Sequence, residues 1–391
     1  MQFPALADQK VNLQMPNRNF AMKKRASILS GFTRWIVFVF GYTTLLPLGG
    51  FAQQYQETDL VSNSSQEKVV TVDPNLIDPW GIARSSTGPW WVSDKGKGVS
   101  TIYNGSGQPA PPVLVTVPSA GQAPTGSPTG IVFNGGLDFA VAPGKGAIFI
   151  FATFDGTIAA WNPQVNPAVA IQKHKAPPRS VFSGATIALN KENRFLYVTD
   201  VHEGKVRVFD TNFSPVEVPS DVFRDTDLPE NFVPFNIQNI GGNLYVAFAK
   251  RNAAKNFVDL GRNLGAVDVF SPRGELLQRL ERGPFLNAPW GLVQAPSDFG
   301  AFSHSILVGQ FGSGQILAFD VVTGRFQGKL EDQNGQVIQK PGLWGIAFGA
   351  GNSNSGGANA LFFNVGTDQG AGGLFGSLTP VAADLVQGND Q

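Results

Sequence analysis

The feature that most constrains the fold of this chain is a short string that recurs at intervals of about fifty residues. In its first copy it reads Pro-Trp-Gly-Ile-Ala, and later copies keep apolar and small residues at equivalent places. The six copies begin at Pro79, Pro128, Gly184, Pro234, Pro289 and Leu343. A period of this length is typical of architectures in which one supersecondary unit is copied and stacks on its neighbours.

Each copy is followed by runs whose composition predicts β-strands, because β-branched and aromatic residues dominate them. The second strands are expected at 90–94, 148–151, 196–200, 244–247, 306–309 and 361–364. Third strands after a glycine turn are expected at 156–162, 204–210 and 314–320, and weaker fourth strands at 113–117 and 275–280. Four strands per repeat match the blade of a propeller. The sequence therefore predicts an all-β fold, a six-bladed β-propeller with four-stranded blades.

The two ends of the repeat array predict how the ring closes. After Leu378 the sixth copy has no fourth strand, whereas the segment 58–62 precedes the first copy and has no other partner. Closed β architectures avoid unpaired edges. We therefore expect the ring to be closed by an N-terminal strand in the last blade.

Residues 1–52 have the pattern of a signal peptide with an N-terminal extension. Six Lys and Arg precede or begin a short apolar run at 35–46, and small residues follow up to Ala52. A secretory apolar region has roughly 7 to 15 residues, whereas a membrane-spanning helix needs about 20. We expect cleavage after Ala52, a propeller at 53–378, a tail at 379–391 and no membrane span after cleavage; an uncleaved anchor is the alternative. The expected location is secreted, periplasmic or in the cell envelope.

Composition and missing motifs narrow the functional classes. Lys plus Arg (29) equals Asp plus Glu (29), so the chain has no basic field to attract nucleic acid. The absence of Cys excludes disulfides, thiolate catalysis and Cys-ligated metals. The sequence has no G-x-S-x-G elbow, P-loop, dinucleotide fingerprint or EF-hand loop. The three histidines have no partner at metal-ligand spacing. No reaction is indicated, the catalytic residues are unknown, and whether the chain is an enzyme stays open.

Several ordered strings between about residue 55 and residue 378 carry a resemblance to a known family. They are Leu60-Val61-Ser62-Asn63, Asp78-Pro79-Trp80-Gly81, Pro128-Thr129-Gly130-Ile131-Val132-Phe133-Asn134, Ala288-Pro289-Trp290-Gly291-Leu292 and Leu343-Trp344-Gly345. The chain resembles exported bacterial β-propeller proteins of unknown function and, more distantly, propellers built from NHL repeats. The resemblance implies the propeller fold and an exported location, but no reaction.

Aromatic residues of the repeated string are candidate ligand-binding residues. Trp80, Trp290 and Trp344 occupy the same place in three copies. Bulky side chains at such a place fill the space between blades, because sheets packed face to face need them. The alternative is that these tryptophans line the central channel and stack on a ligand, together with Asp78 at the start of the first string.

Acidic residues are candidates for a metal site. If the first strand of each blade lines the channel, the turn after the second strand lies on the same face as the start of the first. That face would carry Asp94, Asp155, Asp200 and Asp368, beside Asp78. Carboxylates converging there could hold Ca²⁺, which takes six to eight oxygens, or supply general acids and bases. The alternative is that each Asp accepts hydrogen bonds from nearby backbone amides, as Asp in turns commonly does.

Three hypotheses for the function follow. The first is a ligand- or protein-binding module, expected to be monomeric, that uses the pore-mouth face and takes an unknown protein or small molecule. The alternative is a metal-assisted hydrolase, lactonase or lyase with an acidic pore-mouth site, in which the cation acts as a Lewis acid. The third is a structural role in an envelope or matrix assembly.

Overall fold

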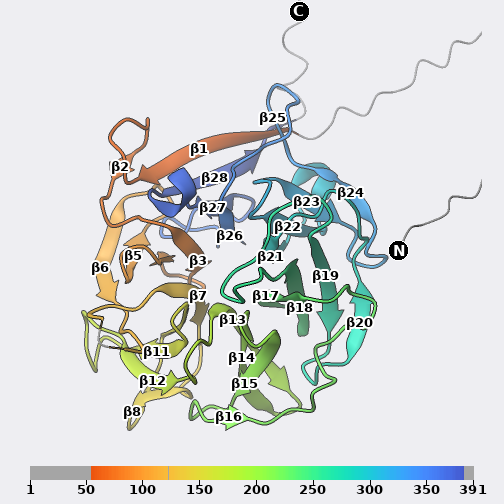
Figure 1. Ribbon diagram of the computed structural model, residues 1–391. Coiled ribbons are helices and arrows are strands. Elements are labelled where there is room, and N and C mark those ends of the chain that lie inside the picture. Colours follow the sequence, from red (N-terminus) through yellow and green to blue (C-terminus); the bar gives the residue numbers. More distant parts are fainter. Residues whose placement is uncertain (1–53, 122, 383–391) are drawn as a thin grey trace, which may run out of the picture. The chain divides into compact units, whose positions relative to one another are not determined.

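The computed structural model describes residues 54–121 and 123–382, and these form six sheets around a common axis (Figure 1). Blade 1 contains β3 (Pro79–Ala83), β4 (Trp90–Asp94), β5 (Val99–Tyr103) and β6 (Pro109–Thr116); blade 2 contains β7 (Pro128–Phe133), β10 (Phe149–Thr153), β11 (Thr157–Trp161) and β12 (Ile171–Lys175). Blade 3 contains β13 (Phe182–Asn190), β14 (Asn193–Asp200), β15 (Lys205–Phe209) and β16 (Pro215–Val216).

The other three blades repeat this antiparallel order. Blade 4 contains β17 (Phe232–Ile240), β18 (Asn243–Lys250), β19 (Gly265–Phe270) and β20 (Leu276–Arg279); blade 5 contains β21 (Pro289–Gln294), β22 (Ile306–Gln310), β23 (Ile316–Phe319) and β24 (Phe326–Lys329). Blade 6 contains β26 (Leu343–Phe348), β27 (Leu361–Val365), β28 (Leu374–Pro380) and β1 (Gln54–Ser62), with β2 (Thr71–Val72) and β25 (Glu331–Asp332) paired to β1. A small hairpin of β8 (Ala140–Ala142) and β9 (Lys145–Gly146) lies within blade 2.

The predicted six-bladed propeller with four-stranded blades is confirmed. In the described part of the chain, helices are limited to the short 3₁₀ turns η1 (Gly300–Phe302) and η2 (Asp368–Gly370). The innermost strands are β3, β7, β13, β17, β21 and β26, the strands that carry the repeated string. Each of them contacts the innermost strand of the next blade, and β26 contacts β3. The ring is therefore continuous around its axis.

The blades are held together by apolar side chains between neighbouring sheets. Because successive residues of a strand face opposite sides, the two tryptophans of β4 enter different interfaces. Trp90 packs with Phe362 and Phe375 of blade 6, whereas Trp91 packs with residues of blade 2. The rings of Trp91 and Phe149 stack at a centroid distance of 4.3 Å. Aromatic burial of this kind is the main stabilising contribution in a chain without disulfides.

The expected closure by an N-terminal strand is also confirmed. β1 pairs antiparallel with β28 from Tyr55, opposite Pro380, to Ser62, opposite Leu374. Tyr55 is fully buried, and its hydroxyl donates a hydrogen bond to the carbonyl of Phe299 in blade 5 at 3.0 Å. The outer strand of the last blade therefore comes from the start of the described chain.

Glycines of the repeated string allow the innermost strands to approach one another closely. A Cβ at these glycines would meet backbone of the next blade: Thr129 O at 2.5 Å from Gly81, Ala185 N at 2.6 Å from Gly130, Trp344 O at 2.7 Å from Gly291 and Trp80 O at 2.8 Å from Gly345. In blade 4 this place is taken by Asn236, whose amide nitrogen donates to Trp290 O at 2.6 Å. We refer to Gly81, Gly130, Gly184, Asn236, Gly291 and Gly345 as the inner ring.

The predicted boundaries at the two ends of the chain compare with the structure only in part. The expected signal peptide at 1–52 and the tail beyond residue 382 lie outside the described residues. β28 continues to Pro380, so the last blade extends slightly past the predicted boundary at 378.

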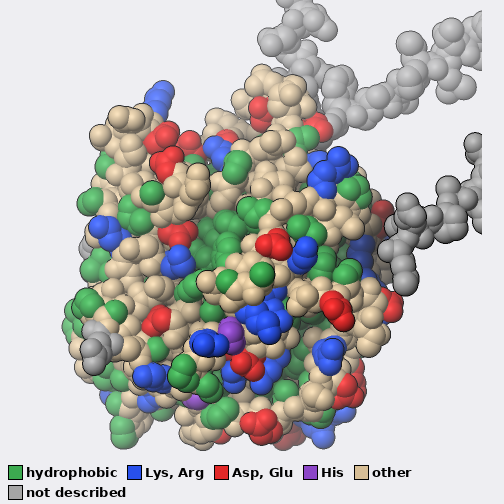
Figure 2. Space-filling model, in the orientation of Figure 1, with side chains coloured by type: hydrophobic (Ala, Val, Ile, Leu, Met, Phe, Trp, Pro, Cys, Tyr) green, Lys and Arg blue, Asp and Glu red, His purple; other side chains and the backbone are tan. Residues whose placement is uncertain are grey.

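Within the described residues, none of the helices has the length and apolar character needed to cross a membrane. On the face seen in Figure 2, Lys and Arg are interspersed with Asp and Glu, and hydrophobic side chains lie near the middle of the ring.

Candidate binding site in the central channel

One mouth of the channel is closed by aromatic side chains, which we call the aromatic plug. It comprises Trp80, Phe154, Phe235, Phe257, Trp290, Phe311 and Trp344. Trp80 of blade 1 lies with its ring centroid 6.3 Å from that of Phe235 in blade 4, the opposite blade of the ring. Aromatic rings from opposite blades therefore meet across the axis, and the channel is filled at this mouth.

The candidate tryptophans of the repeated string all belong to the aromatic plug. Trp80 and Trp344 stack at 3.6 Å, and Trp290 meets both rings edge to face. All three are at most 4% exposed. The indole nitrogen of Trp290 donates to Ser183 O at 3.1 Å and that of Trp80 donates to Asp78 Oδ1 at 3.1 Å. Each tryptophan thus packs on other aromatic residues of the plug, which fills the channel at this mouth.

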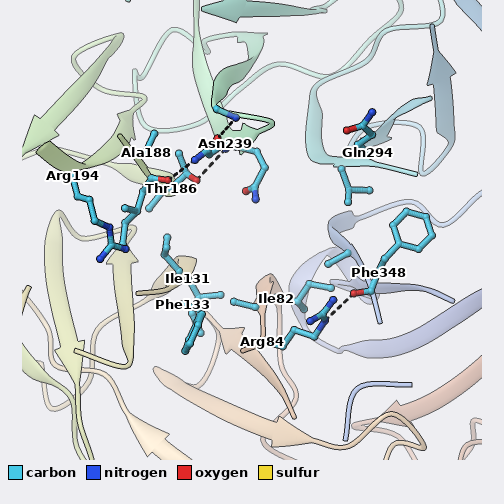
Figure 3. Close-up of a pocket in the computed structure, with 18 of the residues that line it drawn as sticks. Ile82, Arg84, Ile131, Phe133, Thr186, Ala188, Arg194, Asn239, Gln294 and Phe348 are labelled. Carbon is cyan, nitrogen blue, oxygen red and sulfur yellow. Dashed lines mark hydrogen bonds between the residues drawn. The ribbon is translucent and has the colours of Figure 1, made fainter. Parts of the chain in front are cut away.

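The opposite mouth of the channel opens into a central cavity of about 640 Å³ (Figure 3). All six blades contribute to its wall through the second half of their innermost strands. The apolar lining includes Ile82, Ile131, Phe133, Ala185, Ile187, Ala188, Val293, Ala347 and Phe348. A narrower space of about 80 Å³, lined by glycines of the inner ring and by Trp290, continues the channel toward the aromatic plug. The central cavity is thus open at one end and bounded by the plug at the other.

Arg84 is a charged residue at the wall of the central cavity. It follows the last residue of β3 and donates from Nε to Phe348 O at 2.8 Å, from Nη2 to Gly349 O at 2.9 Å and from Nη1 to Ser85 O at 3.1 Å. Its guanidinium carbon also lies 5.4 Å from the centroid of the Trp90 ring, a distance at which cation–π attraction operates. Burial lowers the pKa of Arg84. Blades 1 and 6 together fix this cation.

Arg194 and three amide side chains supply the other polar groups of the cavity. Arg194 is paired with Asp138 and also donates to Asn134 O. Asn239 is anchored to blade 3, because its backbone N–H donates to Thr186 Oγ1 at 3.1 Å and its Nδ2 donates to Ile187 O at 2.9 Å. Gln294 donates to His304 O at 3.3 Å. Gln238 lines the cavity, and the structure shows no hydrogen bond from its side chain to any described residue.

The acidic candidates lie toward the mouth of the channel that the aromatic plug fills, at the ends of strands and in turns. Asp94 ends β4, Asp155 lies in the turn after β10, Asp200 ends β14, and Asp368 lies in η2. Asp78 precedes β3 with a φ of 47° and pairs with Lys95, whose Nζ lies 2.7 Å from Asp78 Oδ2.

Three of these carboxylates accept hydrogen bonds from their own surroundings. Asp94 Oδ2 accepts from the backbone N–H and the hydroxyl of Thr101 at 3.0 and 2.8 Å. Asp155 accepts from the N–H groups of Ala120 and Ser127. Asp200 accepts from Val181 N, Glu203 N and the Nε of Arg207, the last at 2.8 Å. Only Glu203 lies in the same turn as the carboxylate to which it donates; the other donors lie on a neighbouring strand or in another loop.

A shared cation site is not assembled in this arrangement. Among the described residues, no three Asp, Glu or His side chains lie together as a group that could hold a metal ion. Asp94 is completely buried, and burial raises its pKa well above the usual range. A desolvated carboxyl group of this kind is less readily ionised than a metal ligand has to be. Binding of Ca²⁺ by Asp94, Asp155, Asp200 and Asp368 stays a prediction.

The residues of the central cavity were missed by the sequence reasoning, although a signal for some of them exists. The string of each repeat starts at the plug and runs along the channel, so residues directly after it lie at the other mouth. Arg84 follows Pro79–Ala83 by one position, and Gln238 and Asn239 follow Ile237. Extending each repeated string by one or two residues would have indicated these cavity residues.

Comparisons with known proteins place the chain in a family. No protein-family model matches it. The uncharacterized protein R648 of Acanthamoeba polyphaga mimivirus is 31% identical over 329 residues, which cover 82% of this chain and 78% of R648. The uncharacterized protein L690 of the same virus is 30% identical over 317 residues, which cover 78% of this chain and 81% of L690.

Solved structures add only a distant likeness. Virginiamycin B lyase from Staphylococcus aureus has 12% identity and a TM-score of 0.48, covering 84% of this chain and 100% of that one. A structural genomics protein of unknown function from Bacteroides thetaiotaomicron has 13% identity and a TM-score of 0.49, covering 84% of this chain and 76% of that one. Such values carry no information on activity. The sequence resemblance pointed to bacterial proteins, whereas the relatives with substantial identity are viral. The chain belongs to the same family as the uncharacterized proteins R648 and L690 of Acanthamoeba polyphaga mimivirus.

Proposed function

We propose that this protein is a binding module that holds a small-molecule ligand in the central cavity. The observation that supports this proposal is the cavity itself, about 640 Å³ in volume and lined by all six blades. Ligand pockets in proteins have volumes of roughly 300–1,000 Å³, with mostly apolar walls and a few polar groups that orient the ligand. Arg84, Gln238 and Gln294 are such polar groups.

The chemistry of the wall favours binding over catalysis. Among the described residues that line the cavity there is no Asp, Glu, His, Lys or Ser. General acid–base and nucleophilic catalysis need such groups within reach of the substrate. The one hydroxyl of the lining, on Thr186, accepts a hydrogen bond from the backbone of Asn239. The lining therefore supplies contacts and charge, but no proton-transfer pair.

The proposal moves the site from one mouth of the channel to the other. The sequence reasoning placed it on the face with Asp78, Asp94 and Asp200, where the aromatic plug fills the channel. The cavity at the opposite mouth is the larger open space on the axis. The signal-like pattern of residues 1–52 supports an exported location for the module.

A cavity-filling variant tests the proposal. In Gln238→Trp, an indole replaces a side chain that lines both the central cavity and the narrower space behind it, without removing a hydrogen bond seen in the structure. The matched control is Val322→Trp, because Val322 is 82% exposed in a loop of blade 5. Native mass spectrometry of the purified full-length proteins, followed by extraction and identification of bound molecules, gives the readout.

We expect the wild type and Val322→Trp to carry or bind a small molecule with one-to-one stoichiometry, and Gln238→Trp to lose it. Circular dichroism and the melting temperature establish that the two variants are folded. If Gln238→Trp binds the same molecule as tightly as the control, the ligand lies elsewhere and the proposal is wrong. If the wild type binds nothing in a broad metabolite panel, the binding function itself is refuted.

A further inference from the structure

The charged side chains that line the central cavity are all positive. Arg84 and Arg194 are the charged residues among the described residues that line it. Arg194 is neutralised by Asp138, whereas no described carboxylate lies within ion-pair distance of Arg84. An arginine keeps its charge in proteins at all ordinary pH values. The cavity wall therefore has one cation without an anionic partner.

We infer that the ligand of the central cavity is an amphipathic oxyanion, whose anionic group pairs with Arg84 and whose apolar body lies against the aliphatic wall. This inference rests on the proposed function and specifies its ligand. A half-buried charge with only carbonyl partners is incompletely compensated, because carbonyl dipoles offset desolvation less well than an opposite charge. A bound oxyanion supplies the missing charge.

The hydrogen bonds of Arg84 leave it ready for such a partner. Its guanidinium has five N–H groups, and three of them donate to Phe348 O, Gly349 O and Ser85 O. One N–H remains on each Nη atom. Such N–H groups pair with the oxygens of a carboxylate, a phosphate or a sulfate. Because carbonyls and the Trp90 ring already hold the guanidinium, little side-chain entropy is lost when the anion binds.

The rest of the wall defines the body of the ligand. Ile82 and Phe348 lie near Arg84 in the cavity, and Ile131 and Phe133 line the side of blade 2 (Figure 3). Burial of each methylene group against such a surface raises affinity about fourfold, so a body of several carbons adds substantially to affinity. A small hydrophilic anion such as acetate lacks this contribution. Both halves of the ligand are therefore needed.

Four probes separate these contributions on the wild-type, full-length protein. They are decanoate, the neutral decanamide, the cationic decyltrimethylammonium and acetate, each measured by isothermal titration calorimetry below its micellar concentration. We expect decanoate to bind best and acetate not to bind measurably. A hydrogen bond to a charged group contributes about 1.5–3 kcal/mol, so decanamide should bind roughly 10- to 100-fold more weakly than decanoate.

Variants assign the effect to Arg84. Arg84→Gln should weaken decanoate binding by the same roughly 10- to 100-fold and leave decanamide unchanged, whereas Arg84→Lys should lie between. The control is Arg325→Gln, an exposed cation of blade 5 outside the cavity, which should bind decanoate like the wild type. The comparison of probes on the wild type decides the question even if an Arg84 variant does not fold.

The outcomes distinguish this inference from the proposed function. Equal binding of decanoate and decanamide, or tighter binding of the cation, overturns the oxyanion and leaves a neutral or cationic ligand in the same cavity. Loss of decanoate binding in Gln238→Trp, but not in Val322→Trp, locates the probe in the cavity. If decanoate does not bind at all, the inference is wrong, and the mass spectrometry of Gln238→Trp judges the proposed function separately.

Discussion

Replacing Gly81 of the inner ring by alanine is expected to weaken the contact between blades 1 and 2. The new Cβ would lie 2.5 Å from Thr129 O and 3.1 Å from both Ile131 N and Ile131 Cγ2. Real Cβ atoms stay at least about 3.0 Å from such atoms, so one of the two innermost strands must move. Thr129 cannot move easily, because its hydroxyl lies 2.7 Å from Phe182 O of blade 3 and 3.1 Å from Ala152 O, and it donates its single proton to one of these two carbonyls.

The expected cost follows from two opposing contributions. Overpacking of a close contact costs about 1–3 kcal/mol. The alanine also restricts the unfolded chain, which stabilises the protein by about 0.4–1 kcal/mol. The net loss in the free energy of unfolding should therefore be about 1–2 kcal/mol. For a domain of about 330 residues, the entropy of unfolding is about 0.7 kcal/mol/K, so the melting temperature should fall by roughly 1–3 °C.

Urea unfolding followed by tryptophan fluorescence measures this loss. The matched control is Gly121→Ala, because a Cβ at Gly121 would meet no atom within 4 Å and the residue is exposed. This substitution restricts the unfolded chain in the same way, so it should leave stability unchanged or raise it by up to about 1 kcal/mol. If Gly81→Ala and Gly121→Ala unfold at the same urea concentration with equal slopes, close approach of the blades does not explain the repeated glycine.

Three further predictions concern closure and buried carboxylates. Deleting 54–62 should lower the melting temperature sharply, and a truncated protein that melts like the full-length chain would contradict closure by β1. Burial raises the pKa of Asp268 to about 7, so the folded state holds a proton that the unfolded state loses near pH 4, and stability should fall between pH 4 and 7 by up to about 4 kcal/mol. Asp268→Asn should flatten this part of the melting profile, and parallel profiles would refute the assignment. Asp200→Asn should cost about 2–3 kcal/mol, because Oδ1 accepts from two backbone amides and Oδ2 accepts from Arg207, and the NH2 group that replaces one of these oxygens cannot accept. Asp94→Asn should cost less, because Asp94 Oδ1 has no partner. Chemical denaturation that ranks the two variants in the opposite order would contradict this.

The architecture was predictable from the sequence because its signals are local and repeated. The apolar runs at 90–94 and 196–200 coincide with β4 and with the end of β14, and the expected third strand at 204–210 contains β15. The closure of the ring was predictable by elimination. An expected strand without a partner preceded the first repeat, and the last repeat had no fourth strand. Each inference used the composition of a segment and its place in the order of strands.

The site was less predictable because it depends on contacts between blades that are not neighbours in sequence. The strings indicated that Trp80, Trp290 and Trp344 occupy equivalent positions, but not that their rings pack against one another. In the same way, Asp94 and Asp200 stand at equivalent places, yet one accepts from Thr101 and the other from Arg207. The place of a residue in the repeat determines the position of its backbone. The residues that its side chain contacts differ from blade to blade, and the repeat does not specify them.

Differences among the repeats explain why only one mouth of the channel is filled. The position before the inner ring is large in four blades, with Trp80, Phe235, Trp290 and Trp344, and small in two, with Thr129 and Ser183. The small residues leave room for rings from other blades, as the bond from Trp290 Nε1 to Ser183 O shows. Six large residues would not fit around one axis, and six small ones would leave the channel open throughout. Toward the other mouth, the channel-facing positions of the innermost strands include alanine and short aliphatic residues in several blades, and the space left over is the central cavity. Under the proposed binding function, the ligand preference of this cavity should therefore depend on these non-repeated residues, above all on Arg84.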